Sequence, residues 1–270
     1  KAELLEVSFK KLESRTFIRS KPLTVMSDDG TKIEAFLTLP KANSKSALLV
    51  MPHGGPINIQ DSDSFNAEVQ YLASRGFAVL RVNFRGSAGY GKSFMEQGVG
   101  QFGQLIERDI TAVVKEVNRQ HSFKYQCAVG NSYGGYSATM LAMIHPEQYQ
   151  CVMAGFGIYD LILLFNTSNF RSGENYSKLI EKTVGAYSDS LINVSPVYLA
   201  EKLRAPILLF GGKKDNIADF EHTNRFHYVL QRQQHPVETI FYANTGHGHN
   251  DWWGDRHEAA FKVDYLTRTL

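Results

Sequence analysis

The sequence predicts an α/β fold with a mostly parallel central sheet flanked by helices. Short continuous apolar runs alternate along the chain with segments whose apolar residues recur at helical spacing. Several of these runs end in glycine-rich loops, as expected where a buried strand passes into a turn. The chain has 270 residues, which is long enough for one large hydrophobic core. We therefore expect a single α/β domain.

The chain opens with a segment that fits no core element. Residues 1–21 carry apolar side chains at irregular spacing among charges, so we expect a linker or N-terminal segment there, with the folded domain at 22–270. Residues 22–26 and 32–39 alternate apolar and polar side chains around Ser-Asp-Asp-Gly (27–30). This pattern predicts a hairpin at an edge of the sheet.

A strand, helix and strand unit follows the hairpin. The continuous apolar run 47–51 predicts a strand covered on both faces, and it ends in His-Gly-Gly-Pro (53–56). Helical spacing over 65–74, followed by Gly76 and the apolar run 77–82, predicts a helix with a C-terminal glycine and a second buried strand. These elements form a βαβ unit.

The most distinctive turn surrounds Ser132. The apolar run 127–130 predicts a buried strand, and helix-forming residues follow the serine. Gly130 and Gly134 flank Ser132 as Gly-x-Ser-x-Gly, and the missing side chains allow a strained turn that lifts the serine hydroxyl above the sheet. The backbone N–H of Tyr133 then points to where an oxyanion would form.

The rest of the chain continues the alternation of helices and strands. Residues 159–196 are the exception, because polar and glycine residues interrupt them, and we expect an irregular excursion over the active-site end of the sheet. The other elements, in chain order, are a glycine-rich loop at 83–92, helices at 105–117 and 136–144, strands at 149–156 and 207–210, a helix at 220–230, a strand at 237–242 and an amphipathic helix at 257–270.

Charge and hydropathy exclude two classes of partner. The formal net charge is +2, and no basic block is interleaved with aromatic residues, so we expect neither nucleic acid nor an anionic membrane surface as a partner. The longest apolar runs are of strand length and far too short to span a bilayer. The sequence does not determine the oligomeric state, and a homo-oligomer is compatible with it.

Both cysteines fall on predicted internal strands. Cys127 and Cys151 are therefore expected to be reduced core residues, since buried cysteine often behaves as a small apolar side chain. We expect a cytoplasmic protein, although two buried thiols also fit an oxidising compartment, and a periplasmic or secreted location is left open.

An acid and a histidine follow two later strands. Asp215 comes after the strand at 207–210 and His247 after the strand at 237–242. The carboxyl ends of parallel strands meet at one edge of the sheet, so these side chains are expected near Ser132. A serine hydroxyl needs a base, and the base needs a carboxylate to fix its tautomer. The order serine, acid, histidine is that of α/β-hydrolases.

Each partner of the serine has a rival in the sequence. His249 lies two residues after His247 and is the alternative base. Asp160, after the strand at 149–156, is the alternative acid, although the residues around it also suit the start of a helix with Asp160 as its cap.

Several motifs together resemble a known family. Over nearly its whole length the chain resembles the catalytic domain of the prolyl oligopeptidase family, in the branch of acylaminoacyl and dipeptidyl peptidases. The resemblance rests on HGGP (53–56), RGFAVLRVNFRGSAGYGKSF (75–94), GNSYGGY (130–136), SPVYLAEKLRAPILLF (195–210) and TGHGH (245–249).

The resemblance implies roles for individual residues. Ser132 matches the nucleophile, Asp215 the triad acid and His247 the triad histidine. The Tyr133 N–H is the first oxyanion donor, and His53, through its side chain or its loop, is the second. His53 bracing the glycine-rich loop is the alternative.

The resemblance also suggests the substrate pocket. Phe156, Tyr159 and Ile217 match positions around the residue that precedes the scissile bond, and their apolar or aromatic character suits an apolar or proline-like side chain. Asn131 departs from the relatives, which often carry arginine, glycine or tryptophan before the serine.

The implied activity is that of a serine peptidase. We expect hydrolysis of short peptides through an acyl-enzyme, with no metal or cofactor, and relatives usually carry a β-propeller that in this case would precede residue 1. The alternatives are a carboxylesterase or amidase acting on small acyl substrates and a catalytically silent binding module, since the fold alone does not determine the substrate.

Overall fold

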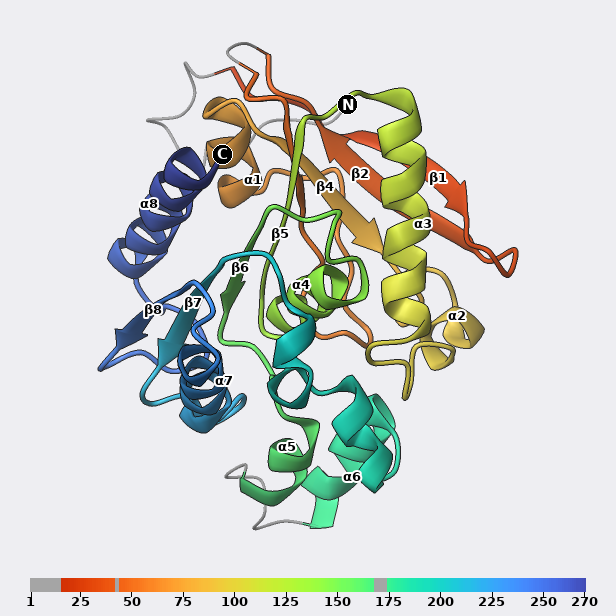
Figure 1. The fold of residues 1–270 in the computed structure, drawn as a ribbon. Coiled ribbons are helices and arrows are strands. Elements are labelled where there is room, and N and C mark those ends of the chain that lie inside the picture. Colours follow the sequence, from red (N-terminus) through yellow and green to blue (C-terminus); the bar gives the residue numbers. More distant parts are fainter. Residues whose placement is uncertain (1–15, 42–43, 168–173) are drawn as a thin grey trace, which may run out of the picture.

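The fold is a central sheet covered by helices on both faces (Figure 1). The computed structural model describes residues 16–41, 44–167 and 174–270. Within them the eight strands lie in the order β1-β2-β4-β3-β5-β6-β7-β8. Their bounds are β1 Lys21–Met26, β2 Lys32–Thr38, β3 Ala47–Val50, β4 Ala78–Asn83, β5 Tyr125–Asn131, β6 Cys151–Gly155, β7 Ile207–Gly212 and β8 Val237–Tyr242.

The sheet is mostly parallel, as predicted. The hairpin strands β1 and β2 pair antiparallel, and β2 joins β4 antiparallel. From β4 through β3 to β8 all pairs are parallel. Strands β3, β4, β6 and β7 are buried along their whole length, which explains their continuous apolar sequences.

Helices cover the two faces of the sheet. One core joins the sheet to α3, α4 and α7, and a second core on the other face joins it to α1 and α8. The helix bounds are α1 Ala67–Ser74, α2 Lys92–Glu96, α3 Leu105–Gln120, α4 Tyr133–Ile144, α5 Leu161–Thr167, α6 Glu174–Val184, α7 Phe220–Arg232 and α8 Trp252–Thr269.

The predicted excursion is more regular than expected. Instead of an irregular segment, residues 159–196 contain α5 and α6, which lie beyond the carboxyl end of β6 in Figure 1, and a 3₁₀ helix, Asp189–Val194. Leu161 and Leu164 are buried in the core. Burial of the apolar face of α5 therefore stabilises a helix despite the polar residues nearby. Several of the polar residues that suggested an irregular segment fall within 168–173, outside the described residues.

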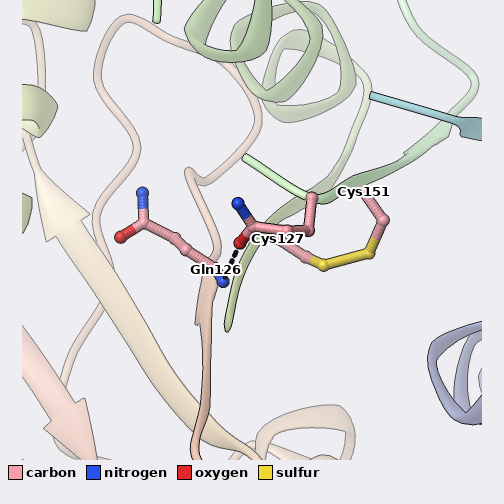
Figure 2. Close-up of a disulfide and its surroundings, with 4 residues drawn as sticks. Gln126, Cys127 and Cys151 are labelled. Carbon is pink, nitrogen blue, oxygen red and sulfur yellow. Dashed lines mark hydrogen bonds between the residues drawn. A yellow bond between two sulfur atoms is a disulfide. The ribbon is translucent and has the colours of Figure 1, made fainter. Parts of the chain in front are cut away.

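The prediction of two reduced cysteines is wrong. Cys127 on β5 and Cys151 on β6 occupy the same register and form a disulfide, with their Cα atoms 4.7 Å apart (Figure 2). Both residues are fully buried. The sequence could not show this, because the pairing depends on β5 and β6 being neighbours in register.

The expected linker at 1–21 lies mostly outside the described residues, which begin at 16. Its described part contacts the domain, because Ile18 exchanges two hydrogen bonds with the Gln70 amide of α1, at 2.9 and 2.7 Å. Within the described residues, no helix combines the length and apolar character needed to cross a bilayer.

Candidate active site

Ser132 occupies a strained turn between β5 and α4. Its backbone has φ 58° and ψ −128°, a conformation that non-glycine residues rarely adopt. The flanking glycines permit the turn. A Cβ on Gly130 would lie 2.5 Å from the Gly134 backbone, and one on Gly134 would lie 2.3 Å from the Pro52 carbonyl oxygen.

The three residues predicted as a triad form one hydrogen-bonded chain. The His247 Nδ1–H donates to Asp215 Oδ2 at 2.8 Å, because a carboxylate can only accept. This tautomer leaves Nε2 free to accept the Ser132 hydroxyl, also at 2.8 Å. The Asp215 side chain is only 1% exposed, and its other oxygen accepts the N–H groups of Ile217 and Ala218.

The alternative base, His249, and the alternative acid, Asp160, form their hydrogen bonds and ion pairs elsewhere. His249 donates from Nε2 to Glu258 Oε2 at 3.1 Å. Asp160 is buried, pairs with Arg225 at 2.6 Å and caps α5 by accepting the Leu163 N–H, which confirms its expected role as a cap. Neither side chain is hydrogen-bonded to Ser132 or His247.

The His53 side chain contacts its own loop and the loop that follows β4. Its Nδ1–H donates to the Gly54 carbonyl at 2.7 Å, and Nε2 accepts the Ser87 hydroxyl at 2.8 Å. The ring stacks on Phe84 at 4.2 Å. Burial lowers the pKa of His53, so the ring is neutral. Each ring nitrogen of His53 thus already has a hydrogen-bond partner, and these bonds brace the loop.

The backbone of this loop lies close to the serine. A Cβ on Gly54 would lie 3.6 Å from Ser132 Cβ. Within the described part of the chain, the Gly54 N–H has no hydrogen-bond acceptor. Gly54 is a candidate oxyanion donor that the sequence reasoning placed only as part of the His53 loop.

Tyr133 supplies the other candidate donor. It is the first residue of α4, so its N–H has no acceptor within the helix. Its ring is fully buried, and its hydroxyl donates to Glu107 Oε1 of α3 at 2.9 Å. Burial raises the pKa of Glu107 to about 7. No local sequence pattern marks Glu107, which looks like one polar position of an amphipathic helix.

One of the three expected pocket residues lines the main cavity. Phe156 does so from the end of β6, whereas Tyr159 is fully buried against Phe226 and Ile217 is 48% exposed. The cavity of about 930 Å³ lies between the active site and the helices α1 and α8. Its lining includes Asn66, Ala67, Glu68, Tyr71, Arg75, Asn131, Ser132, Phe156, His247, Gly248, His249, Asp255, Arg256, Glu258, Ala259, Ala260 and Lys262.

A buried charged cluster beside this cavity was not predicted. Lys262 of α8 contacts Glu258 at 2.7 Å and Glu68 at 2.6 Å, and Glu258 also accepts a hydrogen bond from Asn131 at 2.9 Å. In sequence, Glu258 and Lys262 look like an ordinary surface pair four residues apart on a helix. Among the described residues, no cluster of three or more His, Cys, Asp or Glu side chains could hold a metal ion.

The fold and the serine, histidine and aspartate chain define an α/β-hydrolase. The sequence matches the Prolyl oligopeptidase family over residues 63–270, and the chain belongs to this family.

Curated relatives match most of the chain. The chain is 29% identical to Dipeptidyl aminopeptidase BIII of Pseudoxanthomonas mexicana, over 88% of the chain and 37% of that protein. It is 25% identical to the Acylamino-acid-releasing enzyme of Homo sapiens, over 81% and 31%. The chain thus spans about a third of the length of these relatives.

Solved structures show the same fold. Acylaminoacyl peptidase of Pyrococcus horikoshii superimposes with a TM-score of 0.88 at 21% identity, covering 98% of the chain and 44% of that structure. A puromycin hydrolase superimposes with a TM-score of 0.84 at 22% identity, over 93% and 39%.

Proposed function

We propose that this chain is the catalytic domain of a serine peptidase that hydrolyses short peptides through an acyl-enzyme. One observation carries the proposal. The Asp215 carboxylate, the His247 ring and the Ser132 hydroxyl form an unbroken chain of hydrogen bonds on a strained turn, in a member of the prolyl oligopeptidase family.

The geometry supports the following steps. His247 Nε2 accepts the hydroxyl proton as Ser132 Oγ attacks the amide carbonyl, and Asp215 stabilises the resulting imidazolium. The N–H groups of Tyr133 and Gly54 donate to the oxyanion of the tetrahedral intermediate. His247 then gives the proton to the leaving amine, and water releases the acyl group by the same steps.

The names of the relatives support the substrate class, because they include a Dipeptidyl aminopeptidase and an Acylamino-acid-releasing enzyme. We expect peptides cleaved near their amino end. In this reaction the side chain before the scissile bond contacts Phe156, whose buried ring lies beside His247, with ring centroids 6.5 Å apart.

Chromogenic substrates test the proposal on the full-length protein. The panel contains acyl-Ala, acyl-Phe, Ala-Pro and Gly-Pro derivatives and a butyrate ester, with Ser132→Ala as the control. We expect peptide cleavage that is lost in Ser132→Ala by a factor of at least about 10³. Ester cleavage without peptide cleavage would instead identify a carboxylesterase or amidase, and no labelling of Ser132 by an organophosphonate would indicate a silent binding module.

The disulfide supports a compartment different from the cytoplasm expected from the sequence. Structural disulfides persist mainly in oxidising compartments, so Cys127–Cys151 favours a periplasmic or secreted protein. Cell fractionation measures the location directly, and recovery of the protein in the cytoplasm with free thiols would contradict this assignment.

A further inference from the structure

A buried carboxylate on α8 contacts the segments on both sides of the active site. Glu258 Oε1 accepts the Asn131 Nδ2–H at 2.9 Å, and its Oε2 accepts the His249 Nε2–H at 3.1 Å. Asn131 directly precedes Ser132, and His249 lies two residues after His247. One side chain therefore links the strand end that carries the nucleophile to the loop that carries the base.

The loop that carries the base needs such an anchor because its backbone is intrinsically free. His247 lies between Gly246 and Gly248, and Gly248 has φ +97°. Glycine restricts the chain less than any other residue, so the position of His247 depends on contacts outside these two glycines. His249 is the first side chain beyond the second glycine.

The His249 ring is held on several sides. Its centroid lies 4.5 Å from that of Tyr242 and 5.6 Å from that of Phe156, both with the rings nearly perpendicular. A Cβ on Gly254 would lie 2.2 Å from His249 Nδ1, so α8 packs directly against the ring. These contacts hold the ring with Nε2 directed at Glu258.

A neighbouring lysine keeps the Glu258 carboxylate charged. Lys262 Nζ lies 2.7 Å from Glu258 and 2.6 Å from Glu68, and the Glu258 and Lys262 side chains are 6% and 2% exposed. Burial by itself raises the pKa of Glu258, but attraction to Lys262 and hydrogen bonds from His249, Lys262 and Asn131 outweigh it and lower the pKa to about 2.

We propose that Glu258 is a positioning residue of this peptidase, which fixes the separation of Ser132 and His247 by binding Asn131 and His249. The inference rests on the proposed function of the chain as a serine peptidase. Glu258 acts through its two partners and has no direct hydrogen bond to either Ser132 or His247.

The expected effect is on turnover rather than on substrate affinity. A displacement of reacting groups by about 1 Å can reduce a rate by about 10²-fold. We therefore expect Glu258→Gln to lower kcat by about 10- to 100-fold while KM changes by less than about threefold. A glutamine amide nitrogen cannot accept the His249 Nε2–H, so that link is weakened without a large change in shape.

The test compares variants that break one link at a time in the full-length protein. His249→Phe keeps a ring and removes the donor, whereas His249→Gln keeps a donor near the position of Nε2. Glu68→Gln removes the charge of the other partner of Lys262 but leaves the bonds of Glu258 to Asn131 and His249 intact. Titration of active sites gives kcat per competent enzyme, so a fraction of unfolded protein does not lower it.

We expect His249→Phe to lose as much kcat as Glu258→Gln, the double variant to lose little more, and His249→Gln to recover most of the rate. Phosphonylation of Ser132 by an organophosphonate, followed by mass spectrometry, should slow in parallel. The inference is overturned if His249→Phe retains wild-type kcat, or if Glu68→Gln loses as much kcat as Glu258→Gln.

A readout independent of activity separates this inference from the proposed function. Hydrogen–deuterium exchange of the amides at 245–250 should accelerate in Glu258→Gln and His249→Phe but not in His249→Gln. A wild-type protein that neither cleaves peptides nor labels at Ser132 would defeat the proposed function. Unchanged exchange in all variants would defeat the positioning role, even in an active enzyme.

Discussion

The carboxyl group of Glu107 lies fully buried beneath the residue that supplies an oxyanion donor. It accepts the Tyr133 hydroxyl at 2.9 Å, and burial raises its pKa from 4.5 to about 7. The folded protein therefore holds a proton on Glu107 that the unfolded chain releases above about pH 4.5. The contribution of this side chain to the stability of the domain therefore decreases as pH rises from about 4.5 to about 7.

Replacing Glu107 by glutamine should remove this dependence. The amide oxygen of Glu107→Gln still accepts the Tyr133 hydroxyl, but the side chain carries no proton to lose. Relative to wild type, the variant should gain about 3 kcal/mol in free energy of unfolding between pH 4.5 and pH 8. Urea unfolding at both pH values measures the gain, and an equal difference at the two values would contradict the raised pKa.

At the scale of elements, the disulfide joins the strand before the nucleophile to its neighbour. The Ser132 N–H also donates to the Gly155 carbonyl of β6 at 2.8 Å, so the strained turn is attached to the same strand by two kinds of bond. The cysteine residues are fully buried, and the loop that they close has a sequence separation of 24 residues.

Removal of the disulfide should cost stability with little loss of turnover. For a loop of this length, the double variant Cys127→Ala, Cys151→Ala should lower the free energy of unfolding by about 2–4 kcal/mol. We expect kcat to stay within about threefold, because the Ser132 hydrogen bond to β6 remains. Wild-type protein unfolded with and without reductant is the matched control. No difference between these two wild-type curves would contradict a stabilising disulfide.

The sequence predicted which helices and strands exist more accurately than the residues at which they begin. Apolar runs located the buried strands, because a strand covered on both faces needs such a run. The last helix begins at Trp252 rather than at residue 257. Asp251 caps this start by accepting the Gly254 N–H at 2.7 Å. The exposed Trp252 and Trp253 disguise this start, because they break the expected pattern of a polar outer face.

At the scale of the whole molecule, topology explains why the triad was visible in the sequence. Ser132, Asp215 and His247 follow β5, β7 and β8, whose parallel pairing brings their carboxyl ends to one edge. Glu107 and Glu258 lie on helices and reach the site only through tertiary packing. Their roles therefore could not be read from spacing or local pattern.

Buried ionisable groups also determine how the whole domain responds to acid. Burial lowers the pKa of His222 to about 3, so the folded protein keeps this ring neutral while the unfolded chain protonates it below about pH 6.5. The pKa of Glu258, lowered to about 2, makes its stabilising contribution disappear as pH falls from about 4.5 towards 2.

Below about pH 4.5, His222 and Glu258 both reduce the free energy of unfolding as the pH falls. Between about pH 4.5 and 6.5, the effects of His222 and Glu107 on the free energy of unfolding have opposite signs. We therefore expect the free energy of unfolding to change little over the upper range and to fall steeply below about pH 4.5. Thermal unfolding monitored by circular dichroism from pH 3 to pH 8 measures the profile. A midpoint temperature that stays constant down to pH 3 would contradict it.

The charged cluster of α8 also has an evolutionary consequence. Glu68, Asn131 and the Glu258–Lys262 pair come from three distant parts of the sequence but are joined by ion pairs and a hydrogen bond. Loss of the charge at Glu258 or at Lys262 leaves the other buried side chain without its nearest partner, which costs several kcal/mol unless another position changes with it. Among relatives that replace Asn131 by arginine or tryptophan, positions 68, 258 and 262 should therefore covary with it.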